Sequence, residues 1–170
     1  MKYSVIGIAA VLSASCGYHV SGHADLMPAE IKAIAVPAFG NSTTRYTLTQ
    51  RLPMAISREL INRTRYKVVA EPDEADAVLE GNVVNYFSYP TVFDPASGRA
   101  SGVQLILVLD VRLRDRRKGT ILFDRPAMQV QNRYEISADQ IAYFEESDAA
   151  LERASRDVAR SVVSAMLENF

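Results

Sequence analysis

The feature that most constrains the fold of this chain is a run of apolar residues at alternate positions. Six residues follow this pattern without a break: Val103, Leu105, Leu107, Leu109, Val111 and Leu113. Because side chains two positions apart in a strand point to the same face, these six form one continuous apolar surface. We therefore predict a strand over residues 103–115 with one face against a hydrophobic core. The opposite face carries Ile106 and Val108 at one end and charged residues at the other.

The segments around this strand predict a mixed architecture. In order, they are a buried central strand at 32–39, a helix at 49–63, a short extended piece at 66–69, strands at 77–93, 103–115 and 120–134, and a helix at 147–168. Apolar residues that recur every three or four positions indicate the two helices. These elements are buried most simply when both helices pack on one face of a mixed, roughly four-stranded sheet. The prediction is an α+β fold of order β-α-β-β-β-α.

Glycine and proline predict where regular strand pairing is broken. Gly81 and Pro90 lie within the 77–93 strand and favour a bulge or a local end of pairing. Pro126 lacks a backbone donor, which predicts that the 120–134 strand is an edge strand or is interrupted. Gly119 follows three basic residues and can supply the positive φ of a short hairpin turn.

The N-terminus has the pattern of an export signal. A basic residue, Lys2, precedes an apolar run over 5–12, and small residues then lead to Cys16, the single cysteine of the chain. The apolar run is shorter than the ~20 residues that a bilayer span needs. A thiol directly after such a signal is where bacterial lipoproteins are cleaved and modified with acyl chains such as palmitate. We predict lipidation at Cys16 and attachment to a membrane through this lipid anchor.

These observations predict a signal peptide over residues 1–15, a lipidated tether over 16–31 and a single domain over 32–170. One position departs from the usual lipoprotein pattern, because Ser13 stands where Leu is common three residues before the cysteine. The alternative is an ordinary secretory signal that leaves Cys16 as a free thiol, which is a liability in an oxidising compartment.

Composition and motifs argue against several function classes. The whole chain has 19 Lys and Arg and 20 Asp and Glu, so it gives no support for nucleic-acid binding. Neither a G-x-S-x-G nucleophile motif nor a phosphate-binding glycine loop occurs. Cys16, His19 and His23 have a spacing that could suit a metal, but a structural zinc site needs a fourth ligand. We therefore predict no catalytic residues, no metal site and no cofactor.

Basic residues cluster at the predicted turn after the 103–115 strand. Arg114, Arg116, Arg117 and Lys118 stand there, and the topology places Arg99 at the opposite tip of the sheet. Arginine binds phosphate through two parallel hydrogen bonds, so these residues are candidate contacts for an anionic lipid such as lipopolysaccharide. The alternative is a solvated turn whose charges block edge pairing, and residue types alone favour that interpretation.

The sheet face opposite the helices offers another candidate contact. Ile106 and Val108 lie on this face, which no predicted helix covers. Two exposed apolar side chains are common on soluble domains and need no function. The same pair is equally a candidate docking site for a partner protein.

Short motifs resemble the LptE family of lipopolysaccharide-assembly lipoproteins. They are the Cys16-Gly17-Tyr18-His19-Val20 start, the strand at 33–36 followed by Pro37 and Phe39, the 65–69 segment after the helix, and the 75–81 segment that leads into the long strand. The resemblance spans essentially all of 16–170. It implies two helices on a four-stranded sheet and a non-enzymatic lipoprotein of the outer membrane, facing the periplasm.

The resemblance also implies a partner and a task. LptE-like proteins are expected to sit inside the β-barrel LptD, to act there as a plug and assembly aid, and to contact lipopolysaccharide on its way to the outer leaflet. Only Cys16 is carried over, as the lipidated residue, and Gly17 lacks the Asp that commonly retains lipoproteins at the inner membrane. The alternative function is an accessory periplasmic lipoprotein of another envelope transport complex.

Overall fold

The computed structural model describes residues 27–135 and 140–170, with side chains from 149 onward in the second range. The predicted signal peptide, Cys16 and most of the tether therefore lie outside the described residues. The elements are β1 (Ala33–Ala35), β2 (Gly40–Asn41), α1 (Leu48–Arg63), β3 (Lys67–Val69), the 3-10 turn η1 (Pro72–Glu74), β4 (Ala77–Phe93), β5 (Ala100–Asp115), β6 (Ile121–Glu135) and α2 (Gln140–Glu168). Within the described ranges, no helix combines the length and the apolar character needed to cross a bilayer.

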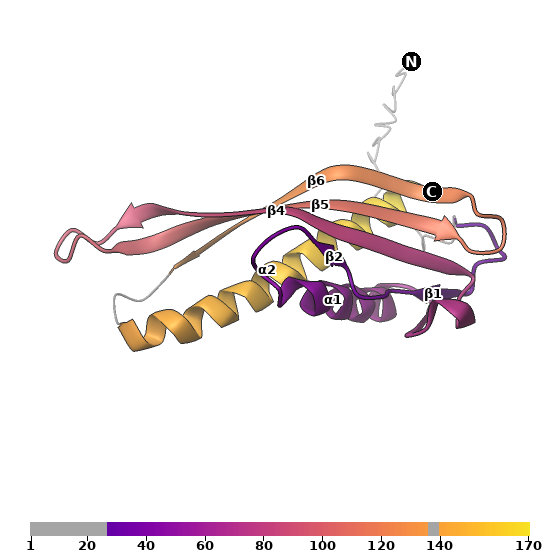
Figure 1. Cartoon of the computed structure of the whole chain (residues 1–170), viewed down its shortest axis with the longest axis horizontal. Helices are drawn as coiled ribbons and strands as arrows, with labels where there is room; N and C mark the ends of the chain where they lie inside the picture. Colours follow the sequence, from indigo (N-terminus) through magenta and orange to yellow (C-terminus); the bar gives the residue numbers. More distant parts are fainter. Residues whose placement is uncertain (1–26, 136–139) are drawn as a thin grey trace, which may run out of the picture.

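The sheet is mixed and both helices cover the same face, which confirms the predicted α+β class (Figure 1). The strand order is β3-β1-β4-β5-β6, and the short β2 pairs with β4 beside this path. β1 is parallel to β3 and to β4, so it is the central strand that its apolar sequence predicts. β4, β5 and β6 form an antiparallel meander. Two short strands, β2 and β3, add to the four that the sequence predicts.

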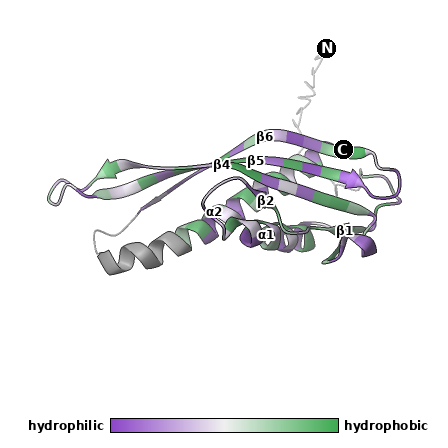
Figure 2. Ribbon diagram, viewed as in Figure 1, coloured by the Kyte–Doolittle hydropathy of each residue, from purple (hydrophilic) through white to green (hydrophobic). Residues whose placement is uncertain are grey.

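The core lies between the helices and the apolar face of β5. All six alternating residues from Val103 to Leu113 are buried, whereas their neighbours on the other face are exposed or half-buried. Figure 2 shows the hydropathy of each residue along the strands and helices. α1 contributes Leu52, Ile56 and Leu60 to this core, and α2 contributes residues including Val158 and Val162. The alternation of β5 therefore sets which face of the sheet receives the helices.

Phe39 connects α1 to the sheet through its backbone and its ring. Pro53 inside α1 has no N–H to donate to the carbonyl of Thr49, four residues earlier. That carbonyl instead accepts a hydrogen bond from the backbone N–H of Phe39 (3.1 Å). The Phe39 ring is buried against Gly81 of β4, where an added Cβ would lie 2.2 Å from the ring. Gly81 thus permits a close approach between the ring and the strand.

The breaks in strand pairing lie partly where proline and glycine predict them. Gly81 pairs regularly with Val111, so no bulge forms at this glycine. On the other side of β4, pairing with β1 ends at Val78 and pairing with β2 begins at Asn82, so the predicted local end of pairing occurs there. Register shifts in β4 occur between Val83 and Asn85 and again after Pro90. Gly119 has a φ of 68°, as the predicted hairpin turn requires.

β6 is an edge strand and is also interrupted, so both predictions from Pro126 are confirmed. The shift occurs where Leu109 pairs with Met128 and Val111 pairs with Arg125. Ala127 has a φ of 50° at this point, and its N–H donates to the Oδ1 atom of Asp110 (2.8 Å). The irregular backbone and exposed charges disfavour further pairing along this edge.

Candidate functional site

The basic turn 115–119 lies at one end of the sheet, which we call the near end because the described chain also enters there. Buried Asp115 shapes the turn, since its Oδ1 atom accepts the backbone N–H groups of Arg117 (2.8 Å) and Lys118 (2.9 Å). The backbone N–H of Arg116 donates to the carbonyl of Asp76, at the start of β4 (2.9 Å). The turn is therefore fixed in place.

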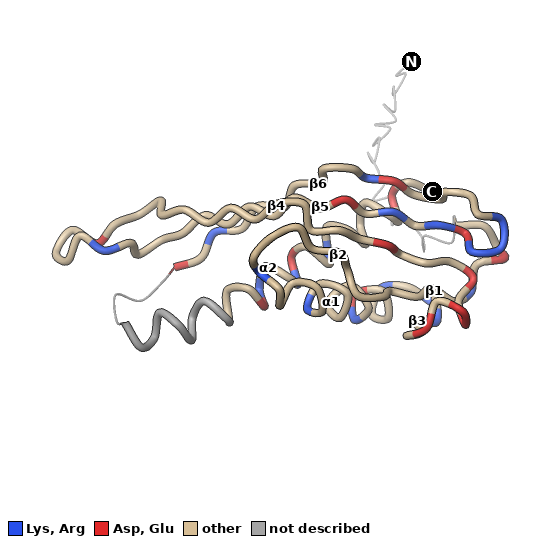
Figure 3. The backbone as a smooth tube through the Cα atoms, viewed as in Figure 1, with Lys and Arg blue, Asp and Glu red and all other residues tan. Residues whose placement is uncertain are grey.

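Each basic side chain of this cluster has an acidic partner from another part of the chain. The ion pairs are Arg114 with Glu80, Arg116 with Asp73 (3.0 Å), Arg117 with Asp76 (2.6 Å) and Lys118 with Glu30. Figure 3 shows Lys and Arg gathered at the turn, with Asp and Glu on adjacent segments. The hydrogen bond from Lys118 to Glu30 raises the pKa of the lysine. The positive charge of the turn is thus largely compensated within the molecule.

Asp76 connects the turn to the first strand. Its Oδ2 atom accepts the backbone N–H groups of Lys32 and Ala33, each at 3.0 Å, and its Oδ1 atom accepts from Arg117. The hydrogen bond from Lys32 is the largest of the interactions that lower the pKa of Asp76, and those from Ala33 and Arg117 add to it against partial desolvation. The carboxylate therefore stays ionised and holds three segments together.

Arg99 lies at the opposite, far end of the sheet, in the loop between β4 and β5 (Figure 1). The Oδ1 atom of Asp94 orders this loop by accepting the backbone N–H groups of Ala96 (3.1 Å) and Ser97 (2.7 Å) and the Ser97 hydroxyl. These contacts, led by the Ser97 hydroxyl, lower the pKa of Asp94. The five predicted anion contacts are consequently divided between the two ends of the molecule.

Ile106 and Val108 lie together on the sheet face that carries no helix. Cross-strand pairing places Phe87 beside Ile106, and Tyr89 and Val92 follow on the same face of β4. Phe87, Tyr89 and Val92 are 47%, 46% and 46% exposed, whereas Ile106 and Val108 are half-buried. We call these five residues the open-face patch. The three β4 residues were not predicted from the sequence, although the alternation of Phe87 and Tyr89 is visible in it.

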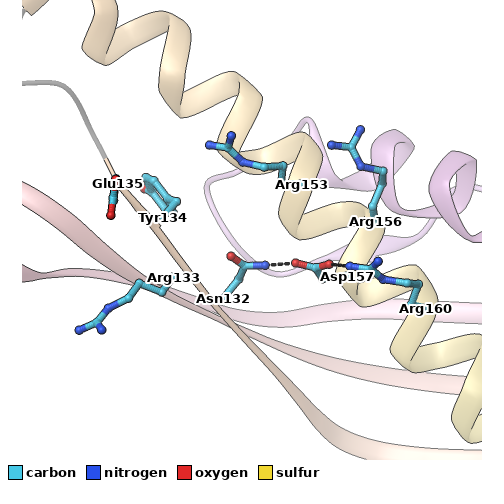
Figure 4. Close-up of a pocket in the computed structure, with 8 residues that line it drawn as sticks. All are labelled: Asn132, Arg133, Tyr134, Glu135, Arg153, Arg156, Asp157 and Arg160. Atoms are coloured by element: carbon cyan, nitrogen blue, oxygen red, sulfur yellow. Dashed lines mark hydrogen bonds and ion pairs between the residues drawn. The ribbon is translucent and has the colours of Figure 1, made fainter.

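A hollow of about 600 Å³ lies between the last residues of β6 and the middle of α2 (Figure 4). Eight residues line this arginine hollow: Asn132, Arg133, Tyr134, Glu135, Arg153, Arg156, Asp157 and Arg160. Asp157 accepts hydrogen bonds from Asn132 on β6 and from Arg160 on its own helix, so it connects the two walls. Sequence reasoning missed this site because β6 and α2 meet only in the folded chain.

A family model described as LptE, lipopolysaccharide-assembly, matches residues 31–166, which is most of the chain. The chain belongs to the LptE family. The resemblance seen in the short sequence motifs is therefore confirmed over residues 31–166. LptE proteins are non-enzymatic lipoproteins of the bacterial envelope that function in lipopolysaccharide assembly. Among curated protein sequences, none matches this chain.

Three solved structures that are described as lipoproteins are similar to this chain in fold. One from Caulobacter crescentus has 18% sequence identity and a TM-score of 0.55, covering 81% of this chain and 88% of its own. Rare lipoprotein B from Shewanella oneidensis has 14% identity and a TM-score of 0.50, covering 78% and 93%. A minor lipoprotein from Acinetobacter baumannii has 12% identity and a TM-score of 0.52, covering 84% and 95%. At these identities the likeness establishes the fold.

Proposed function

We propose that this LptE-family protein is a non-enzymatic outer-membrane lipoprotein that plugs an LptD-like β-barrel and assists its assembly. In this position it takes part in delivering lipopolysaccharide to the outer leaflet. The family match over residues 31–166 carries the proposal. The helix-free sheet face supports it, because a plug must offer an uncovered surface to the wall around it.

The proposal assigns the N-terminus to membrane attachment. Residues 1–15 are removed as the signal peptide and Cys16 carries the acyl chains. The 16–31 segment is the tether to the folded domain at 32–170, and its last residues, from Met27 to Ile31, pack onto that domain. The described chain enters the body at Met27, close to the basic turn. In this proposal the tether connects the lipid anchor to the near end of the sheet. The folded domain faces the periplasm.

The open-face patch is the surface that we assign to the barrel. Aromatic side chains such as Phe87 and Tyr89 are enriched in protein interfaces, where they supply much of the binding energy. Polar Gln104, Gln129 and Gln131 stand on the same face beside them. Arg133 lies opposite Gln104 on this face and stands with Glu135 beside Val92, so the apolar centre has a mainly polar border with charge at one end. An apolar centre with a polar border is typical of protein interfaces.

Arg99, Arg114, Arg116, Arg117 and Lys118 remain proposed contacts for anionic lipid. Exposed ion pairs of the type seen at the turn are each worth about 1 kcal/mol or less, so a phosphate group can exchange with a carboxylate there. Arg99 stands at the far end of the sheet, so in this proposal it contacts the lipid at a different place from the basic turn.

Capture from envelope extracts tests the proposed function. Full-length tagged protein is expected to recover a large outer-membrane β-barrel. The double variant Phe87→Ser, Val92→Ser removes two half-exposed side chains of the open-face patch and is expected to lose the barrel. The matched control Met54→Ser, Ile61→Ser removes two equally exposed apolar side chains from α1 and keeps it.

Two outcomes would contradict the proposal. Recovery of an inner-membrane transporter in place of a barrel would favour the accessory-lipoprotein alternative. Mass spectrometry that finds an unmodified Cys16 thiol in the mature protein would remove the lipid anchor.

A further inference from the structure

All three basic residues of α2 fall on one stripe of the helix. Arg153, Arg156 and Arg160 are separated by three and four positions, a spacing that places side chains on the same side of a helix. The core-facing side of α2 is separate and is formed by buried residues such as Ala154 and Val158. The seven steps from residue 153 to residue 160 cover about 10 Å of helix length. Three guanidinium groups thus line one continuous surface.

The arginine stripe on α2 and the end of β6 form the two walls of a hollow. The arginine hollow measures about 600 Å³, which lies within the usual size range of ligand sites. A second hollow of about 190 Å³, between α1 and α2, is also lined by Arg156 and Arg160. These two arginines therefore stand between two depressions, and a ligand group at either one can reach them.

The acidic residues around the stripe do not balance its charge. Asp157 is shared by Asn132 and Arg160, and the Oε1 atom of Glu152 lies 3.5 Å from Arg156 and 4.0 Å from Arg58. Arg153 has no ion pair with any residue whose side chain the structure describes, which are residues 27–135 and 149–170. Arg133 also lines the hollow but points away from the helix, so the lining has three arginines on α2 against Glu135 and Asp157, an excess of one positive charge.

This excess distinguishes the hollow from the basic turn. At the turn, each of Arg116, Arg117 and Lys118 has its own carboxylate partner. In Figure 4, by contrast, Arg153 and Arg156 extend from α2 without a contact to the other residues drawn, while Arg133 points away from the helix. Arg156 and Arg160 share their carboxylates with Arg58 and Asn132. Arg153 is the arginine of the stripe that has no partner among the described side chains.

We propose that the arginine hollow binds a phosphate group, through Arg153, Arg156 and Arg160. Guanidinium forks match the oxygen geometry of phosphate and form paired, charge-assisted hydrogen bonds with it. The link from Asn132 through Asp157 to Arg160 holds the floor of the site in place. The phosphate comes from a glycolipid headgroup or from free phosphate, and the glycolipid source rests on the proposed function.

Titration calorimetry on the full-length protein in detergent tests this site. The probes are inorganic phosphate, micelles of a phosphorylated glucosamine lipid, and micelles of the same lipid without its phosphates. The variant Arg153→Gln, Arg156→Gln, Arg160→Gln is compared with the control Lys32→Gln, Lys67→Gln, Arg125→Gln, which removes the same charge elsewhere. Arg153→Gln alone, which loses no ion pair with the described residues, provides a second test if the triple variant does not fold.

The triple variant is expected to raise the Kd for the phosphorylated probe by roughly tenfold or more, and the control by little. If inorganic phosphate binds, the ligand of the hollow is free phosphate. If only the phosphorylated lipid binds, the ligand is the phosphate of a lipid headgroup. Equal affinity of wild type for the lipid without phosphates, wild-type affinity in the triple variant, or no binding of any probe would overturn the site. Barrel capture by the triple variant is expected to persist, so the failure of this site is distinct from the failure of the proposed function.

Discussion

Gly81→Ala tests the close contact that joins Phe39 to β4. A Cβ at residue 81 would lie 2.2 Å from Cε2 of the Phe39 ring, well inside van der Waals contact. The ring is 2% exposed and the Phe39 backbone is bonded to Thr49, so the ring cannot turn into solvent. Overpacking of this kind costs about 1–3 kcal/mol, and the lower chain flexibility of alanine in a strand offsets about 0.5–1 kcal/mol. The overlap at 2.2 Å is severe, so we take an overpacking cost of about 2–2.5 kcal/mol, and the net loss of unfolding free energy is then expected to be about 1–2 kcal/mol.

Thermal unfolding followed by circular dichroism measures this loss. At about 2–4 °C per kcal/mol for a chain of this size, the Tm is expected to fall by about 2–8 °C. Phe39→Ala alone is expected to cost about 3–5 kcal/mol because it opens a cavity. In the double variant the new methyl group occupies part of that space, so the two losses are less than additive by about 1 kcal/mol or more. An unchanged Tm for Gly81→Ala, or strict additivity, would refute the argument.

Two further predictions concern the core and the near end. Leu107→Asp places an unpaired carboxylate at a site that is 1% exposed, so we expect no cooperative unfolding transition, and a melt close to that of wild type would contradict the placement of β5. Because the folded-state pKa of Asp76 is lowered from 3.8, its contribution to stability is present above pH 3.8 and is lost as the pH falls through the folded value. Asp76→Asn should therefore be less stable than wild type at neutral pH in urea unfolding, with a difference that shrinks in acid; a constant difference would exclude this linkage.

The sequence predicts most of the fold because its strongest patterns are local. The alternation from Val103 to Leu113 determines both the strand and the face that receives the helices, and β4 has the predicted bounds of 77–93. Pro126 correctly marks the edge strand because a missing N–H has the same effect in any fold. The packing role of Gly81 was not predicted, because the ring that requires a glycine there belongs to Phe39, 42 positions earlier in the chain.

The candidate sites are harder to predict because their chemistry depends on distant residues. The basic turn looks strongly charged in the sequence, but its partners lie far away, as Glu30 and Lys118 show with a separation of 88 positions. The spacing of Arg153, Arg156 and Arg160 was visible as a stripe on a helix. The hollow beside this stripe forms only when β6 packs against α2, so the sequence alone does not reveal it.

The position of β1 has a mechanical consequence. Chain that arrives from the N-terminal side enters the sheet through its middle, because β1 is held between β3 and β4 and runs parallel to both. A pull directed along β1 loads the hydrogen bonds on its two sides together, in shear, and does not peel them apart one by one. The hydrogen bonds that the backbone N–H groups of Lys32 and Ala33 donate to Asp76 resist the same displacement. A domain attached to its tether through β1 would resist a pulling force better than a domain attached through an edge strand.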